Sequence, residues 1–282
     1  MALGAHVSVA GGLHTAFKRA DSIGARAIQI FGASPRAFRG KVPGKEELVA
    51  WQEAWENSAV EKVYLHAAYL VNLASPDPEL RKKSILSLAD HLRIAEALNA
   101  EGVIFHLGSG KGKDIAEAEE RLVAGIVEVI SQVPGEARLF LENSAGGGAK
   151  LGTTVEQVGR YFRAVAKQNK RVGVCIDTAH SFESGVISAY SSQGVEKFIN
   201  DLDLHIGLSH IPVFHVNDSA TPAGSFQDRH ENLGSGKIGR VGLSRFLAHP
   251  KLAGKDFLLE VPGFKGEGPD KENMDILKSL VT

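Results

Sequence analysis

The sequence has little that would suit an oxidising compartment or a membrane. Its 282 residues include a single cysteine, Cys175, which excludes an internal disulfide and is typical of a protein in a reducing cytoplasm. No run of about 18 apolar residues occurs. The first residues, MALGAHVSVAGG, lack the basic start and the long apolar stretch of a signal peptide. We therefore expect a cytoplasmic protein with no membrane-spanning segment.

The chain also lacks an excess of charge of either sign. Its 32 basic and 33 acidic residues give a formal net charge of −1. A domain that binds double-stranded nucleic acid is often strongly basic, so this balance counts mildly against such a partner. It does not exclude one, because bound divalent metals would bring positive charge that a count of side chains omits.

Short apolar runs alternate with helix-like stretches along the whole chain. The runs have the length and β-branched composition of buried strands, and they are residues 3–7, 27–31, 63–66, 103–106, 139–142, 172–177, 211–216 and 257–261. The expected helices are residues 12–24, 45–58, 79–100, 114–131, 154–170, 195–204, 240–249 and 270–281. In the third of them, Ile85, Leu88 and Leu92 recur at helical spacing. This alternation predicts a parallel sheet with helical crossovers.

Eight such units predict one (β/α)8 TIM barrel, with residues 1–282 as a single domain. A barrel of this kind takes roughly 250 residues, which fits the chain. The alternative is an open, doubly wound sheet. That fold would need a glycine-rich phosphate turn after a strand, and GAHVSVAGG does not match the GxGxxG pattern.

Residues that can bind a metal stand at the ends of six successive expected strands. They are His66, His106, Glu142, Asp177, His215 and Glu260. The shortest step between neighbours, from Glu142 to Asp177, is 35 residues, and the longest, from His215 to Glu260, is 45. Each step is about one β/α unit. All six side chains would therefore face the C-terminal mouth of the barrel, where the active sites of this fold lie.

Three carboxylates and three imidazoles in one mouth need a partner for their charge. Asp and Glu are almost never fully buried without one. Divalent metals neutralise them, and a mixed set of His, Asp and Glu ligands is typical of zinc or manganese. A lone histidine at a strand end is more often an ordinary hydrogen-bonded residue. It is the six residues together that predict a metal cluster at the C-terminal face.

Two further segments add three candidate ligands. His180 follows Asp177 by three residues, in the loop that leaves the sixth expected strand. Asp228 and His230 are two residues apart, which places them on the same side of an extended segment. Nine candidate ligands are too many for one ion and suit two or three.

Several segments resemble the endonuclease IV family of apurinic/apyrimidinic (AP) endonucleases. They occur in the family's order from residue 4 to about residue 263, and they are GAHVSVAGG, HAAYLVNLAS, LENSAGGG, VGVCIDTAHSFESG, HVNDSATPAGSFQDRHENLGSGKIG and LEVPG. The resemblance covers nearly the whole chain. It implies a TIM barrel that binds three divalent metals per chain, with zinc expected and manganese an alternative at one site.

The resemblance also implies how the nine ligands are grouped. The first metal would be held by His66, His106 and Glu142. Glu142 would bridge to a second metal, which Asp177, His215 and Glu260 complete. The third metal would be held by His180, Asp228 and His230. Glu142 is in addition the expected catalytic residue, because it could orient the nucleophile.

By the same resemblance, the chain would be an AP endonuclease of base excision repair. It would hydrolyse the phosphodiester on the 5′ side of an abasic site in double-stranded DNA, leaving a 3′-hydroxyl and a 5′-deoxyribose phosphate. A 3′-repair diesterase activity on 3′-blocked ends is also expected. Arg36, Tyr69 and Leu70 would enter the gap left by the extruded nucleotide, and extrusion costs least where pairing and stacking are already lost. The protein would act as a monomer with no obligate protein partner.

A sugar isomerase or epimerase on the same barrel is the main alternative. Such enzymes place Glu, Asp, His and Glu at strand ends around one or two metals, and Glu142, Asp177, His215 and Glu260 alone would satisfy that pattern. The other five candidate ligands would then have no role. A protein that binds damaged DNA without cutting it is a third possibility, and it too gives no reason for so many ligands.

Overall fold

A closed parallel barrel forms the centre of the protein. The computed structural model describes residues 1–112 and 114–281, and residues 113 and 282 of the predicted domain lie outside the described residues. The eight barrel strands in the described residues are β1 (Leu3–His6), β2 (Ala27–Phe31), β3 (Lys62–His66), β4 (Gly102–His106), β5 (Arg138–Glu142), β6 (Val172–Asp177), β7 (Val213–His215) and β10 (Asp256–Leu259). Each strand pairs with its neighbour in parallel, and β1 pairs with β10 to close the barrel. The predicted TIM barrel is therefore confirmed.

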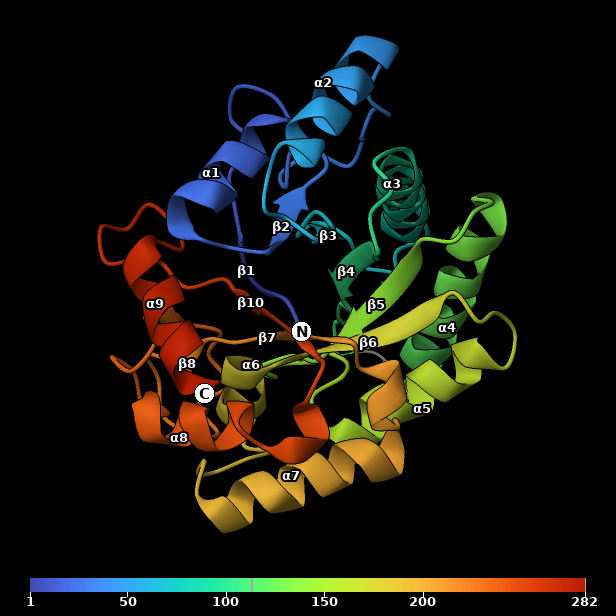
Figure 1. The fold of residues 1–282 in the computed structure, drawn as a ribbon. Helices are drawn as coiled ribbons and strands as arrows, with labels where there is room; N and C mark the ends of the chain where they lie inside the picture. Colours follow the sequence, from blue (N-terminus) through green and yellow to red (C-terminus); the bar gives the residue numbers. More distant parts are fainter. Residues whose placement is uncertain (113, 282) are drawn as a thin grey trace.

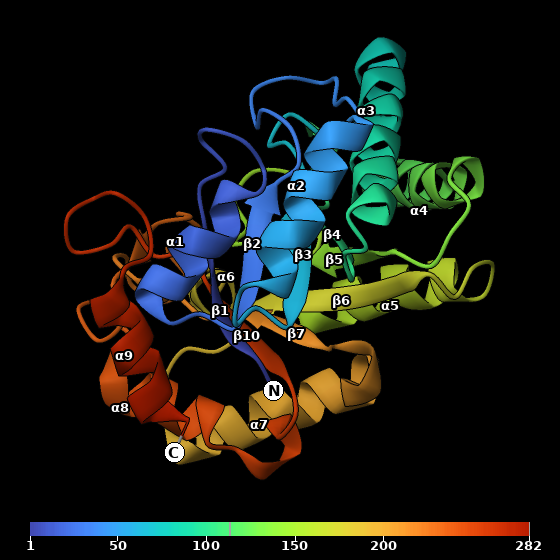
Figure 2. The same ribbon diagram turned by 45° about the horizontal axis from the view of Figure 1, so that its top comes forward.

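A ring of helices surrounds the barrel (Figures 1 and 2). They are α1 (Thr15–Ile23), α2 (Lys45–Glu56), α3 (Pro78–Ala97), α4 (Ile115–Gln132), α5 (Val155–Ala166), α7 (Ser192–His205), α8 (Gly239–Leu247) and α9 (Lys271–Leu280). Polar side chains cap the starts of α3, α4, α5, α7 and α9: the Asp77 carboxylate, for example, accepts from the backbone N–H of Glu79 and Leu80. Among residues 1–112 and 114–281, no helix has both the length and the apolar composition needed to cross a bilayer.

The inside of the barrel is filled by side chains, as expected for this fold. Seven strands each contribute one buried residue to a small cluster, which with Ala2 consists of Ala27, Tyr64, Ile104, Phe140, Cys175, Val213 and Leu258. Below it, the buried Asp256 carboxylate accepts from Tyr64 Oη and pairs with Lys62 Nζ, each at 2.7 Å. The N-terminal end of the barrel is thus packed, and the opposite end is left for the site.

Five short elements among the described residues were not predicted from the sequence. Helix α6 (Thr178–Glu183) follows β6 without a break, so His180 lies on a helix and not in the loop expected for it. Strands β8 (Asp218–Ser219) and β9 (His230–Glu231) form an antiparallel pair outside the barrel. The described part of the chain also contains two short 3₁₀ turns, η1 (Leu208–His210) and η2 (Pro250–Leu252). All of these are too short to show a periodic apolar pattern.

Candidate metal centre

The candidate ligands meet at the C-terminal mouth of the barrel. A cleft of about 1140 Å³ opens there, and His66, His106, His180, His230 and Glu260 are among its lining residues. Within the described residues, three groups of side chains have ligand atoms that all lie within 4.8 Å of one another. The groups share members, as is expected of a cluster of several ions.

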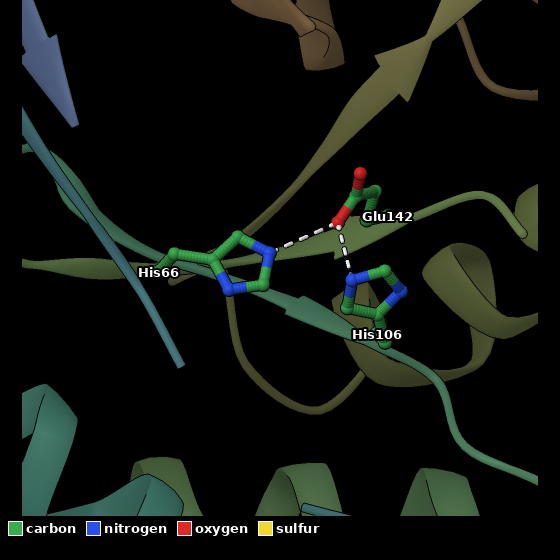
Figure 3. Close-up of side chains that lie close together, drawn as sticks. All are labelled: His66, His106 and Glu142. Carbon is green, nitrogen blue, oxygen red and sulfur yellow. Dashed lines mark hydrogen bonds and ion pairs between the residues drawn. The ribbon is translucent and has the colours of Figure 1, made fainter. Parts of the chain in front are cut away.

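His66, His106 and Glu142 form the first group (Figure 3). The two imidazole Nε2 atoms lie 3.2 Å and 3.6 Å from the same carboxylate oxygen, Oε2 of Glu142. The other ring nitrogen of His66, Nδ1, lies 2.8 Å from the Ala67 carbonyl. Since a carbonyl can only accept, Nδ1 carries a proton and Nε2 is the atom available as a ligand.

Glu142, Asp177, His215 and Glu260 form the second group. His215 lies at its centre, with Nδ1 2.9 Å from Glu142 Oε1 and 3.2 Å from Glu260 Oε2. Glu142 therefore turns one oxygen to the first group and the other to the second. This is the arrangement that a bridging carboxylate requires.

The third group consists of Asp177, His180 and His230. Asp228, expected as the third member, lies beside both histidines: its Oδ2 is 3.4 Å from His180 Nε2, and its Oδ1 is 3.7 Å from His230 Nε2. The structure thus brings the three expected residues together, and the Asp177 carboxylate lies beside them as well, with its ligand atom within 4.8 Å of those of both histidines. Asp177 belongs to two groups, so it connects the second with the third.

The third group shows that the residues fit a cation. The Nε2 atoms of His180 and His230 are buried and have no hydrogen-bond partner among the described residues. The opposite nitrogens are engaged, since His180 Nδ1 lies 3.0 Å from the Asn143 carbonyl and His230 Nδ1 lies 3.4 Å from the Glu260 carbonyl. A buried polar atom without a partner costs free energy. Both nitrogens face the Asp228 carboxylate, and this arrangement suits a divalent metal.

Burial and charge act against each other on the ionisable groups. Burial by itself would raise the pKa of Glu142, but His106 and His215 outweigh it and hold that pKa well below its usual range. Burial would lower the pKa of His180, but the carboxylates of Asp177 and Asp228 raise it well above the ordinary value. The carboxylates therefore favour the protonated form of His180, whereas burial lowers the pKa of His106.

Two residues that orient the ligands were not predicted. Gln29 Oε1 lies 2.8 Å from His215 Nε2, and Gln29 Nε2 donates to Glu260 Oε1 at 2.6 Å. Asn217 Nδ2 donates to Asp177 Oδ2 at 2.7 Å. Such contacts fix the rotamer and the tautomer of a ligand. A sequence signal exists for Gln29, because it is the one polar residue in the apolar run AIQIF.

The three residues expected to contact DNA lie on loops at or near the mouth. Tyr69 lines the cleft, is 64% exposed and packs edge-on against Phe31 with ring centroids 5.4 Å apart. Leu70 is 39% exposed. Arg36 is exposed and follows the cleft-lining residues Ser34 and Pro35. All three side chains are accessible to a large ligand.

Comparison with known proteins places this geometry in a family. The model of the xylose isomerase-like TIM barrel family matches residues 17–280. A probable endonuclease 4 from Halothermothrix orenii is 36% identical over 278 residues, which cover 99% of each chain. Another probable endonuclease 4, from Solibacter usitatus, is 37% identical over 283 residues, covering 99% of this chain and 97% of the relative. The chain belongs to the endonuclease IV family.

Solved structures agree with this assignment. The crystal structure of endonuclease IV from Thermus thermophilus matches with a TM-score of 0.87 and 34% identity, over 100% of this chain and 99% of that one. A D-tagatose 3-epimerase-like protein matches with a TM-score of 0.74 at 19% identity, over 100% and 97% of the two chains, which shows a shared fold alone. The predicted resemblance is confirmed, and as a member of the endonuclease IV family the chain is an enzyme.

Proposed function

We propose that the chain is a metal-dependent AP endonuclease that hydrolyses the DNA phosphodiester 5′ to an abasic site. The products would be a 3′-hydroxyl and a 5′-deoxyribose phosphate, and 3′-blocked ends would be trimmed by the same site. The observation that carries the proposal is that His180, Asp228 and His230 face one another, in addition to the four residues that a sugar epimerase would use. Family membership supports the same assignment.

The nine candidate ligands suit three divalent metals, which we propose to be zinc, with manganese an alternative at one site. When bound, clustered divalent metals lower the pKa of water, neutralise phosphate and stabilise the leaving oxygen. Glu142 would join the first two metal positions, because its Oε2 faces His66 and His106 while its Oε1 faces His215. The same carboxylate would orient the attacking water.

Substrate selection would depend on the rim of the cleft. A phosphate within intact duplex DNA cannot reach a barrel mouth unless the strand is distorted. Tyr69 and Leu70, both exposed after β3, and Arg36, exposed after β2, would fill the gap left by an extruded abasic nucleotide. Extrusion costs a few kcal/mol and least at a site without a base, which gives selectivity for damage. We also propose that residues 1–282 act as one domain and as a monomer.

Incubation with a duplex that carries one abasic-site analogue tests this function. We expect a single nick immediately 5′ to the lesion, no nick in the undamaged duplex, and a new 3′ end that a DNA polymerase extends. A primer with a blocked 3′ end should also become extendable. If the metal-loaded protein leaves the abasic duplex intact, the proposal is wrong, and turnover of a ketose sugar by that same preparation would favour the epimerase alternative.

A further inference from the structure

A buried glutamate lies outside the nine candidate ligands and has no role in the function proposed above. Glu183 is the last residue of α6 and is fully buried. It lies three residues after His180, so both side chains project from the same face of this short helix. The His180 side chain faces Asp228, and the Glu183 side chain faces the backbone of the segment that carries Asp228 and His230.

The Glu183 carboxylate contacts that segment directly. Its Oε1 accepts from the backbone N–H of Arg229 at 3.1 Å and from Ser219 Oγ at 2.6 Å. Arg229 stands between Asp228 and His230 in the chain, so one hydrogen bond acts on the backbone between the two candidate ligands. Ser219 belongs to β8 and pairs with His230 of β9.

The end of α6 is tied to the same segment by its main chain as well. The Glu183 carbonyl accepts from Phe226 N at 2.9 Å, and the Phe182 carbonyl accepts from Gly224 N at 3.0 Å. Helix α6 also lies beside β8 (Figure 1). These two main-chain contacts reach residues 224 and 226, whereas the Glu183 side chain reaches Arg229, within the ligand-bearing residues 228–230.

The second carboxylate oxygen indicates that Glu183 is not there for packing alone. Glu183 Oε2 is buried with no hydrogen-bond partner among the described residues. Burial raises the pKa of this carboxyl group. An apolar side chain of similar length would avoid both costs, so retaining an acid here is explained by what its other oxygen holds.

We propose that Glu183 is a positioning residue, which holds Asp228 and His230 against His180 through the Arg229 amide. It would thereby set the affinity for the third metal, the one that these three ligands would bind. Partners of this kind typically change metal affinity by about 10- to 100-fold when they are removed. The inference rests on the metal cluster of the proposed function and not on DNA cleavage.

Two substitutions of similar size test it. Glu183→Met fills the same space without an acceptor, whereas Glu183→Gln keeps an oxygen that can accept from Arg229 N and Ser219 Oγ. We expect Glu183→Met to weaken binding of one metal by roughly 10- to 100-fold, and Glu183→Gln to leave it unchanged. The readout is metal per chain by elemental analysis after dialysis against graded chelator. Melting temperatures of the chelated proteins show whether each variant folds.

Tyr190→Phe is the matched control. It removes a buried hydrogen bond from Tyr190 Oη to the Thr178 carbonyl at the start of α6, at 2.8 Å, without touching residues 228–230. We expect no change in metal affinity. If Glu183→Met does not fold, Glu183→Asp replaces it, because the shorter side chain keeps the charge and loses the reach to Arg229. Loss of one metal is expected there too.

Three results would overturn the inference. Glu183→Met could retain every metal at the chelator concentration where the wild type does, Glu183→Gln could lose as much metal as Glu183→Met, or Tyr190→Phe could lose it too. A wild-type protein that binds metals but does not nick abasic DNA would reject the proposed function alone. A wild type that nicks, together with a Glu183→Met variant that keeps all its metals, would reject this inference alone.

Discussion

The two halves of the candidate site are built by different means. The strand-end group, made of His66, His106, Glu142, Asp177, His215 and Glu260, stands on or next to the last residues of barrel strands. Neighbouring members are held in register by the sheet itself, as in the pairs His106–Glu142 and Asp177–His215. The outer group, made of His180, Asp228 and His230, stands on α6, a loop and β9.

In the outer group, side chains replace the sheet as the scaffold. The Asp218 carboxylate accepts from four backbone N–H groups of the following segment, those of Gly234, Gly236, Ile238 and Gly239. At position 236 a Cβ would lie 2.4 Å from the Ser219 carbonyl oxygen, so a glycine is needed there. The difference teaches that the sheet fixes the strand-end group, whereas buried carboxylates outside the barrel, Glu183 on α6 and Asp218 on β8, hold the chain segments around the outer group.

The largest effect is expected at the residue that joins two metal positions. Glu142→Ala should lower the rate of abasic-site nicking by roughly 10³-fold or more, because a metal supplies several kcal/mol and each 1.4 kcal/mol is tenfold. It should also remove more than one metal per chain. Single-turnover nicking and elemental analysis check both. Glu136→Ala, an exposed glutamate just before the same strand, is the control, and equal losses in both variants would contradict the assignment.

A smaller effect is expected in the outer group. His230→Ala should release one metal, leave the others bound and slow nicking by about 10²-fold, since one cation and its charge are lost. The same two measurements apply. His205→Ala on α7 is the control, because that histidine pairs with Glu156 away from the mouth. Loss of all metals from His230→Ala would show that the two groups are not separable.

A change at the rim should leave both groups intact. Leu70→Ala should lower kcat/KM for the abasic duplex by roughly tenfold, which corresponds to about 1.4 kcal/mol of the extrusion cost, with metal content unchanged. Steady-state nicking over a range of duplex concentrations measures this. Leu204→Ala, an exposed leucine on α7, should have no effect. An unchanged kcat/KM in Leu70→Ala would remove Leu70 from the substrate surface.

The smallest effect concerns protons. The pKa values of His180 and His215 are raised in the metal-free protein, although burial opposes both shifts. Asp177 contributes to the rise at His180. Cys175 and Glu260 contribute to the rise at His215. Both shifts favour the protonated imidazole, and a ligand nitrogen must lose its proton before it can bind a metal. Zinc uptake should therefore release protons, and affinity should rise with pH. An indicator dye in weak buffer measures the release. Uptake without protons would contradict the pKa directions.

The barrel and the strand-end group could be predicted because they follow from periodic features. Apolar runs of four to six residues recur once per β/α unit, and the last residue or two of each run lie at the mouth. Thus His66, His106, Glu142 and Asp177 end their strands as expected.

The scaffold of the outer group could not be predicted in the same way. Helix α6 spans six residues and β8 and β9 two each, which is below the length at which a pattern can be recognised. Roles such as those of Gln29 and Glu183 depend on contacts between residues far apart in the chain. Buried polar side chains of this kind have no periodic signature.

Reconstitution of the chelated protein with zinc tests the central claim most directly. Nicking of the abasic duplex is measured as zinc is added in fractions of one equivalent per chain, with bound zinc determined at each point. The strand-end group and the outer group together predict that nicking stays low until the third equivalent binds and then rises to its full value. Full activity at one equivalent would contradict a three-metal site.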